Sequence, residues 1–233
     1  MGHEFELPKE IELPASPEEV WRAIATGPGV TAWFMPMEID PESSEVTEWE
    51  PPRKLTIRTT AAEDGSTHAF EYLIEGRDGG TSVLRFVHSG VLGDDWSDEY
   101  EGMTSSGWDM YLFTLAQYLR HFRGRPASYV EAEAPAAGGW GRLRLLLAPV
   151  RLGGQVKIDL PDGPQILGEV DYLTEKFIGL RTSDELIRFH ERSAIGLPIA
   201  VSDHHYGALA DPRRRAESWQ HWLAATVHQG EQA

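Results

Sequence analysis

The stretch DDWSDEYEGMTSSGWDMYLFTLAQYLRHF, residues 94–122, decides the fold of the first half of this chain. It predicts a long amphipathic helix from about Asp98 to Phe122. Its apolar positions follow the helical spacing i, i+4, i+7 and are Trp108, Leu112, Leu115, Leu119 and Phe122. Gly107 precedes the largest of these side chains, although glycine weakens a helix by about 1 kcal/mol relative to alanine. We therefore expect Gly107 to let the helix bend, or approach its neighbours closely.

The segments before this helix predict an antiparallel sheet. Apolar residues alternate with mostly glutamate in the first strand and are Phe5, Leu7, Ile11 and Leu13. Ser16 and Glu19 form a capping box, which indicates a helix directly after that strand. Runs of period two at 53–60, 68–77 and 81–90 predict three more strands. A curved sheet must bury one face, and the long helix is the element long enough to cover it.

The second half has a weaker pattern. Residues 126–139 are rich in Pro, Ala and Gly and predict a linker between a domain at 1–125 and a second α+β half at 140–233. Residues 140–149 fit either a short helix or a strand. Five short strands are expected between 153 and 207, followed by a helix that Asp211 caps. We interpret Arg213-Arg214-Arg215 as a solvated helix start.

Composition excludes several classes of function. The chain has 233 residues, 41% of them hydrophobic, so it can form a substantial core. The net charge of −16 disfavours nucleic acid and anionic membranes as partners. The absence of cysteine excludes disulfides, thiol catalysis and Cys-based metal sites. No secretory signal and no apolar run of about 20 residues is present, so we expect a cytoplasmic protein.

Four segments in order resemble the START-like, or SRPBCC, superfamily, and within it the branch named after the activator of heat shock protein 90 ATPase. They are ELPASPEEVWRAIATGPGVTAWF, EVTEWEPPRKLTI, GGTSVLRFVHSGV and GMTSSGWDMYLFTLAQYL, and they extend over residues 4–125. The resemblance implies an α+β helix-grip fold, in which an antiparallel sheet wraps around a long C-terminal helix. The short segment MEIDPESSEVTEWE lacks the longer glycine-containing hairpin usual in that family, so the sheet is expected to be trimmed.

The second half contains a fainter echo of the first. Trp219-x-x-Trp222-Leu223 repeats Trp108-x-x-Tyr111-Leu112, and each helix follows a strand that ends in His and Gly. One hypothesis is a degenerate second copy of the helix-grip fold, truncated at its N-terminus. The alternative is that two unrelated amphipathic helices look alike.

The resemblance implies a cavity between the last helix and the concave face of the sheet. The candidate ligand-binding residues are Trp33, Phe34, Phe70, Tyr72, Phe86, His88, Trp108 and Tyr111. Trp108 could also be ordinary core, and His88 could be a structural histidine.

Other polar residues give weaker signals for chemistry. Glu71 and Asp109 could serve as general acids if burial raises their pKa. Asp203 and His205 could share one strand face, but two ligands do not complete a metal site. The nucleophile pattern G-x-S-x-G is absent, and the glycine pairs do not precede a lysine-bearing helix. The sequence therefore predicts no metal and no cofactor.

Three functions are compatible with these features. The first is a binding protein that holds a small hydrophobic or amphipathic ligand in the cavity. The second is an enzyme that uses the same cavity, as cyclase- or hydratase-like relatives do in the superfamily. The third is a chaperone-cofactor-like protein with a protein partner, which an apolar patch on the outer sheet face would favour.

Overall fold

The computed structural model describes residues 3–93, 99–147, 151–161, 163 and 165–228. The chain forms two compact units, Met1–Gly124 and Arg125–Ala233. In the described part of the chain, no helix is long and apolar enough to cross a membrane.

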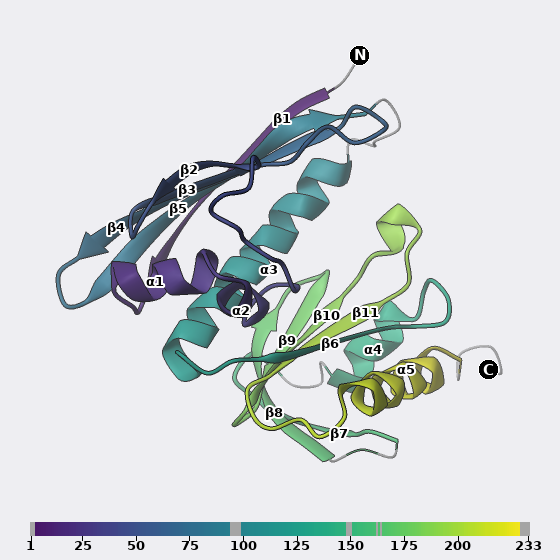
Figure 1. Cartoon of the computed structure of the whole chain (residues 1–233). Helices are drawn as coiled ribbons and strands as arrows, with labels where there is room; N and C mark the ends of the chain where they lie inside the picture. The colour runs from purple at the N-terminus through teal and green to yellow at the C-terminus, as the bar shows by residue number, and fades with distance from the viewer. Residues whose placement is uncertain (1–2, 94–98, 148–150, 162, 164, 229–233) are drawn as a thin grey trace. The chain divides into compact units, whose positions relative to one another are not determined.

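Unit 1 is one antiparallel sheet closed by a long helix (Figure 1). Its elements are β1 (His3–Leu13), α1 (Pro17–Ile24), α2 (Gly27–Thr31), β2 (Val46–Glu50), β3 (Lys54–Arg58), β4 (Thr67–Arg77), β5 (Thr81–Leu92) and α3 (Glu99–His121). The strand order is β1-β5-β4-β3-β2, so the first strand pairs with the last. This arrangement confirms the predicted fold class; Asp98, the expected helix start, lies outside the described residues.

The closing helix packs on the face of the sheet that the sequence pattern selects. The predicted apolar stripe is buried in full and consists of Trp108, Leu112, Leu115, Leu119 and Phe122. Lys9 of β1 points to the same side, where its ammonium group lies 2.7 Å from both Ser105 Oγ and Asp109 Oδ1 on α3. The capping box of Ser16 and Glu19 is also confirmed, with both reciprocal hydrogen bonds present.

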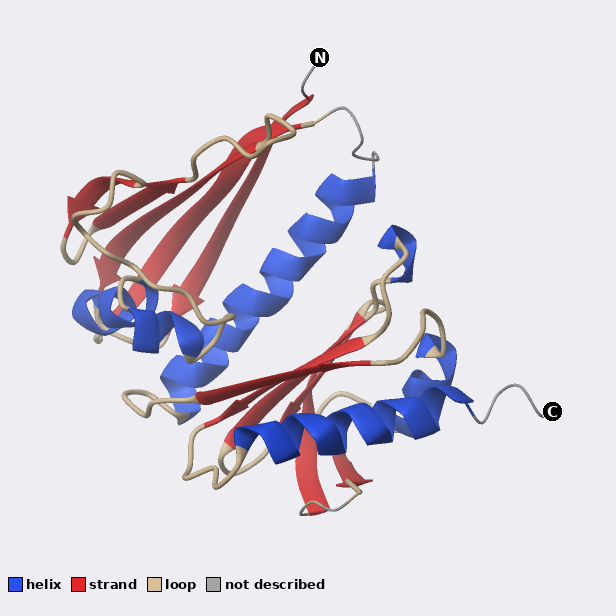
Figure 2. Ribbon diagram, turned by 45° about the vertical axis from the view of Figure 1, so that its right-hand side comes forward, coloured by secondary structure: helices blue, strands red, loops and turns tan. Residues whose placement is uncertain are grey.

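Unit 2 repeats this plan with one more strand. Its elements are β6 (Ser128–Glu133), α4 (Trp140–Leu147), β7 (Gln155–Asp159), β8 (Gln165–Leu173), β9 (Phe177–Arg181), β10 (Glu185–His190), β11 (Ala200–His205) and α5 (Pro212–His228). The strand order is β6-β11-β10-β9-β8-β7, so again the first strand pairs with the last. Figure 2 shows α3 and α5 each beside its own sheet.

Two predictions about the second half are wrong. Residues 126–139 are not a linker throughout, because Ser128–Glu133 forms β6 and pairs along its whole length with β11. The second copy is not truncated at its N-terminus, because β6 and α4 supply the opening strand and helix that precede the meander. The structure therefore contains a second, complete helix-grip arrangement rather than a shortened one.

Candidate functional site

A cavity of about 320 Å³ lies in unit 1 between α3 and the sheet. Its walls come from α3, from β4 and β5, and from the segment after α2. The lining residues are Phe34, Met35, His68, Phe70, His88, Thr104, Gly107, Trp108 and Tyr111. The structure thus brings five of the eight predicted residues together, namely Phe34, Phe70, His88, Trp108 and Tyr111.

The other three predicted residues lie beneath this cavity rather than on it. Trp33 and Tyr72 line a neighbouring void of about 20 Å³. The indole nitrogen of Trp33 donates to the carbonyl oxygen of Ala23 at 2.9 Å, which fixes that ring in the core. Phe86 is fully buried, and its ring centroid is 4.3 Å from that of Trp108. All three support the wall of the cavity from behind.

Trp108 is at once core and cavity wall. Only 7% of the residue is exposed. Its ring stacks on Phe34 with centroids 5.4 Å apart and meets Phe70 edge to face at 5.9 Å. A ring held on several sides in this way gives the cavity one rigid aromatic face.

Gly107 leaves space rather than allowing close contact. A Cβ atom added there would meet no atom within 4 Å. The expectation that this glycine brings the helix close to its neighbours is therefore wrong. Gly107 lines the cavity, so its missing side chain keeps that part of the wall open beside the largest ring of the site.

A chain of hydrogen bonds runs from the helix into the sheet through three residues that line the cavity. Trp108 Nε1 donates to His88 Nδ1 at 2.9 Å, and His88 Nε2 lies 3.1 Å from His68 Nδ1. An indole nitrogen can only donate a hydrogen bond, so Nδ1 of His88 must accept it. A neutral His88 therefore carries its proton on Nε2, and this N–H group donates a hydrogen bond to Nδ1 of His68. His68 then holds its own proton on Nε2. The order of donors is thus set by the tryptophan.

Four cavity residues were not among the predicted ligand-binding residues, namely His68, Met35, Thr104 and Gly107. A usable signal existed for His68, which shares the strand parity of Phe70 and Tyr72 in β4. Thr104 and Gly107 lie one turn or less from Trp108 on α3 and were candidates by helical spacing. No pattern marks Met35.

Burial lowers the pKa of both histidines in this line. The pKa of His88 falls from 6.5 to about 4, chiefly through burial and secondly through the neighbouring His68. The pKa of His68 is also lowered by burial, with a smaller opposing effect of Asp64. Both rings are therefore neutral near pH 7 and act as hydrogen-bonding groups rather than cations.

Acid is expected to destabilise unit 1 through His88. The unfolded state takes up a proton near pH 6.5 and the folded state only near pH 4, so stability is full above 6.5 and is lost as the pH falls between these values. The loss amounts to about 3 kcal/mol. Urea denaturation at a series of pH values measures it. In His88→Gln this pH-dependent term should vanish, and an unchanged profile would contradict the assignment.

Neither Glu71 nor Asp109, the predicted general-acid candidates, lines the cavity. Glu71 pairs with Arg58 at 3.2 Å. Asp109 pairs with Lys9, and 54% of its side chain is exposed. Within the described residues, no group of three or more Asp, Glu or His side chains could hold a metal ion.

The solved structures that are similar to this chain share little of its sequence. No protein-family model and no curated protein matches the chain. A structure from Mesorhizobium loti is similar with 19% identity, covering 51% of this chain and 98% of that chain at a TM-score of 0.43. The Aha1 dimer from Colwellia psychrerythraea is similar with 16% identity, covering 52% and 99% at 0.39. DynU16, a putative protein in the dynemicin biosynthetic locus, is similar with 15% identity, covering 95% of both chains at 0.39.

Both units have the helix-grip arrangement that the sequence resemblance implies. In each unit the first strand pairs with the last, a helical segment follows the first strand, and one long helix closes the sheet. The chain is thus a double helix-grip protein, and the sheet of its first unit has five strands where that of the second has six.

Proposed function

We propose that unit 1 binds a small hydrophobic or amphipathic molecule in the cavity that Trp108 and Gly107 line. The observation that carries the proposal is the open space of about 320 Å³ against a wall of aromatic rings. Protein interiors are close-packed and seldom keep large voids. Ligand pockets begin at about 300 Å³ and are mostly apolar with a few polar groups. This cavity has that size and that lining.

The polar edge of the cavity favours a ligand with a hydrogen-bond acceptor. His88 donates to Nδ1 of His68, so the neutral His68 ring carries its remaining proton on Nε2. A carbonyl or hydroxyl oxygen placed beside His68 would accept a hydrogen bond from that N–H group. The rings of Phe34, Phe70 and Trp108 would contact the apolar body of the same molecule.

The two other functions have less support. The cavity lining contains two histidines and a tyrosine but no carboxylate among the described residues, so a convergent acid–base set is incomplete. The outer face of the sheet in unit 1 carries ion pairs such as Arg58 with Glu71 and Arg85 with Glu10. Among the described residues of this unit, Met35 alone is a large apolar residue that is exposed. An apolar docking face is not formed there.

Substitutions of Gly107 test the proposal without removing any contact. Gly107→Leu should fill the cavity and weaken the binding of Nile red, a neutral hydrophobic dye, at least about tenfold, a loss of about 1.4 kcal/mol. Gly107→Ala should stabilise the helix by up to about 1 kcal/mol with a smaller effect on the dye. Fluorescence titration and urea denaturation measure the two quantities.

Gly102 provides the matched control. It lies on the same helix, a Cβ atom there also meets nothing within 4 Å, and it does not line the cavity. Gly102→Leu should therefore leave dye binding unchanged. If the wild type does not bind the dye, or if both leucine variants bind it as the wild type does, the cavity is not a binding site.

A further inference from the structure

We propose that unit 2 contains a second ligand site of different chemistry, which binds the ammonium group of a small amphipathic amine. The site is the cavity beside Glu185 and His205, at the start of α5. It goes beyond the apolar site proposed for unit 1 and does not depend on it.

The two units have an equivalent hydrogen bond at the centre of the closing helix. In unit 1 the indole nitrogen of Trp108 donates to His88 on the last strand. In unit 2 the indole nitrogen of Trp219 donates to Asp203 on the last strand, at 2.9 Å. Trp219 and Asp203 therefore occupy the places of Trp108 and His88, with a carboxylate in place of the imidazole.

The equivalence extends to the neighbouring strand. Two residues beyond His88, Gly90 pairs with His68 on β4. Two residues beyond Asp203, His205 pairs with Glu185 on β10. Glu185 thus stands where His68 stands in unit 1. Each of the two side chains lines a cavity at the same end of its closing helix.

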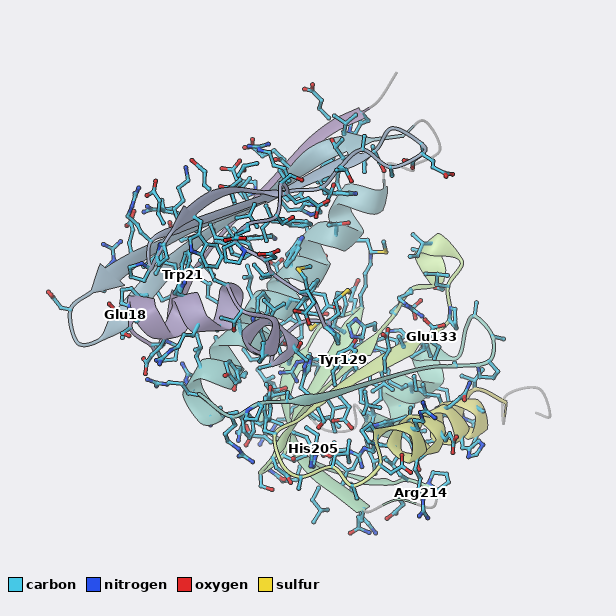
Figure 3. All side chains as sticks on the ribbon, in the orientation of Figure 1. Glu18, Trp21, Tyr129, Glu133, His205 and Arg214 are labelled. Atoms are coloured by element: carbon cyan, nitrogen blue, oxygen red, sulfur yellow. The ribbon has the colours of Figure 1, made fainter. Side chains whose placement is uncertain are left out.

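The cavity of unit 2 measures about 430 Å³. Its lining residues are Gly163, Glu185, His205, Ala208, Leu209, Ala210, Asp211, Arg214, Arg215 and Ser218. His205 at the end of β11 and Arg214 on α5 are labelled in Figure 3. The strands and the start of α5 contribute its polar side chains, whereas the loop after β11 contributes small and apolar ones, Ala208, Leu209 and Ala210.

The buried charges beside the cavity do not balance. Arg215 Nε donates to Asp203 Oδ2 at 2.8 Å, and Arg215 Nη2 donates to Glu185 Oε1 at 2.5 Å. All three residues are buried, with exposures of 5%, 0% and 7% for Arg215, Asp203 and Glu185. This arrangement corrects the interpretation of all three arginines as solvated. One permanent cation, Arg215, stands between two carboxylates, so with His205 neutral an ionised Glu185 leaves one negative charge uncompensated.

Two hydrogen-bond acceptors on residues that line this cavity have no protein donor among the described residues. His205 Nδ1 lies 3.1 Å from Glu185 Oε1, which already accepts from Arg215. A neutral His205 that donates from Nδ1 to the ionised Glu185 has its Nε2 as an acceptor. Neither Glu185 Oε2 nor His205 Nε2 has a partner among the described residues. An ammonium group offers N–H donors to both atoms and supplies the missing positive charge.

Two further charged residues line the cavity, Asp211 and Arg214. Asp211 accepts from the backbone of Arg213 and Arg214 at the start of α5. The side chain of Arg214 is exposed and also lines the cavity. Ala208, Leu209 and Ala210 form the apolar side, which suits a short hydrocarbon body attached to the amine.

The raised pKa of Glu185 is consistent with a site that binds a cation. Burial, and secondly the charge of Asp203, raises the pKa of Glu185 from 4.5 to about 7, against the opposing effects of Arg215 and His205. Below that pH the proton is the balancing charge, and an incoming ammonium must displace it. The affinity for an amine should therefore rise as the pH increases to about 7 and level off above it.

Calorimetric titration of the full chain with benzylammonium tests the site. At about pH 8, benzylammonium should bind at least about tenfold more tightly than benzyl alcohol or benzoate, which share its ring. Glu185→Gln keeps the shape and an acceptor for Arg215 but removes the charge, and it should weaken amine binding at least about tenfold. Lowering the pH to about 6 should weaken binding to the wild type by about tenfold through the proton on Glu185.

Two further variants keep the test independent of folding defects and of unit 1. Ala208→Trp alters an exposed lining residue away from the ion pairs, and it should block amine binding while the protein stays folded. Gly107→Leu should leave amine binding unchanged, because that residue belongs to the other cavity. The proposal is overturned if benzylammonium does not bind, if the alcohol binds equally well, or if Glu185→Gln and Ala208→Trp bind the amine as the wild type does.

Discussion

Replacing Trp108 with alanine is expected to lower the free energy of unfolding of unit 1 by about 3–5 kcal/mol. The ring is 7% exposed and contacts Phe34, Phe70 and Phe86 at centroid distances of 5.4, 5.9 and 4.3 Å. Its removal would join the cavity to the core and leave His88 Nδ1 without its donor. Urea denaturation followed by circular dichroism measures the loss. The denaturation curve should be fitted with two transitions, because two compact units need not unfold together.

Trp108→Phe separates the ring from its hydrogen bond. Phenylalanine retains most of the aromatic wall but cannot donate to His88, so the expected loss is about 1–3 kcal/mol for the buried acceptor. Trp108→Ala should also weaken Nile red binding, because it removes the rigid face of the site. A loss below about 1 kcal/mol in the alanine variant would show that the ring is not part of the core.

Local periodicity predicted most of unit 1. The stripe that begins at Trp108 has helical spacing, and β4 and β5 alternate, so element type and inward faces follow from short stretches alone. Phe70 and His88 were selected for that reason, and they are opposite one another in the sheet. Tyr72 and Phe86 have the same parity but lie one pair further from the cavity. Parity gives the face of a residue, not its depth.

The features that were missed depend on residues distant in the sequence. Ser128–Glu133 has the composition of a linker, and β11, about seventy residues later, makes it a strand. Arg215 belongs to a run of three arginines that is typical of a solvated helix start. It is buried because Asp203 on β11 and Glu185 on β10 bind its guanidinium group. Such ion pairs leave no trace in local spacing.

Replacing Arg215 with methionine should be the most damaging change in unit 2, with an expected loss of about 3–5 kcal/mol at about pH 8. Methionine keeps the apolar stem of the side chain but removes the guanidinium cation between Asp203 and Glu185, whose oxygens lie 2.8 and 2.5 Å from the nitrogens of Arg215. Two buried carboxylates would then face each other without a counter-charge. Arg214→Met is the matched control, because the adjacent side chain is exposed and its loss should change stability by less than about 0.5 kcal/mol.

The pH dependence of this loss distinguishes charge from packing. The pKa of Glu185 is raised from 4.5 to about 7, so the stability that its protonated form provides is present below pH 4.5 and is lost as the pH rises through about 7. At about pH 5.5 the carboxyl is protonated and Arg215→Met leaves only Asp203 uncompensated, so the loss should be smaller than at pH 8. A packing defect would cost the same at both values. Because His88 has the opposite sign, acid should weaken unit 1 while it strengthens the Glu185 contribution in unit 2. Buried His190 also lies in unit 2, and burial lowers its pKa to about 3, so acid weakens unit 2 through His190 as well. The Glu185 contribution is therefore measured as the difference in stability between the wild type and Glu185→Gln, and a difference that does not change as the pH rises through about 7 would contradict the assignment.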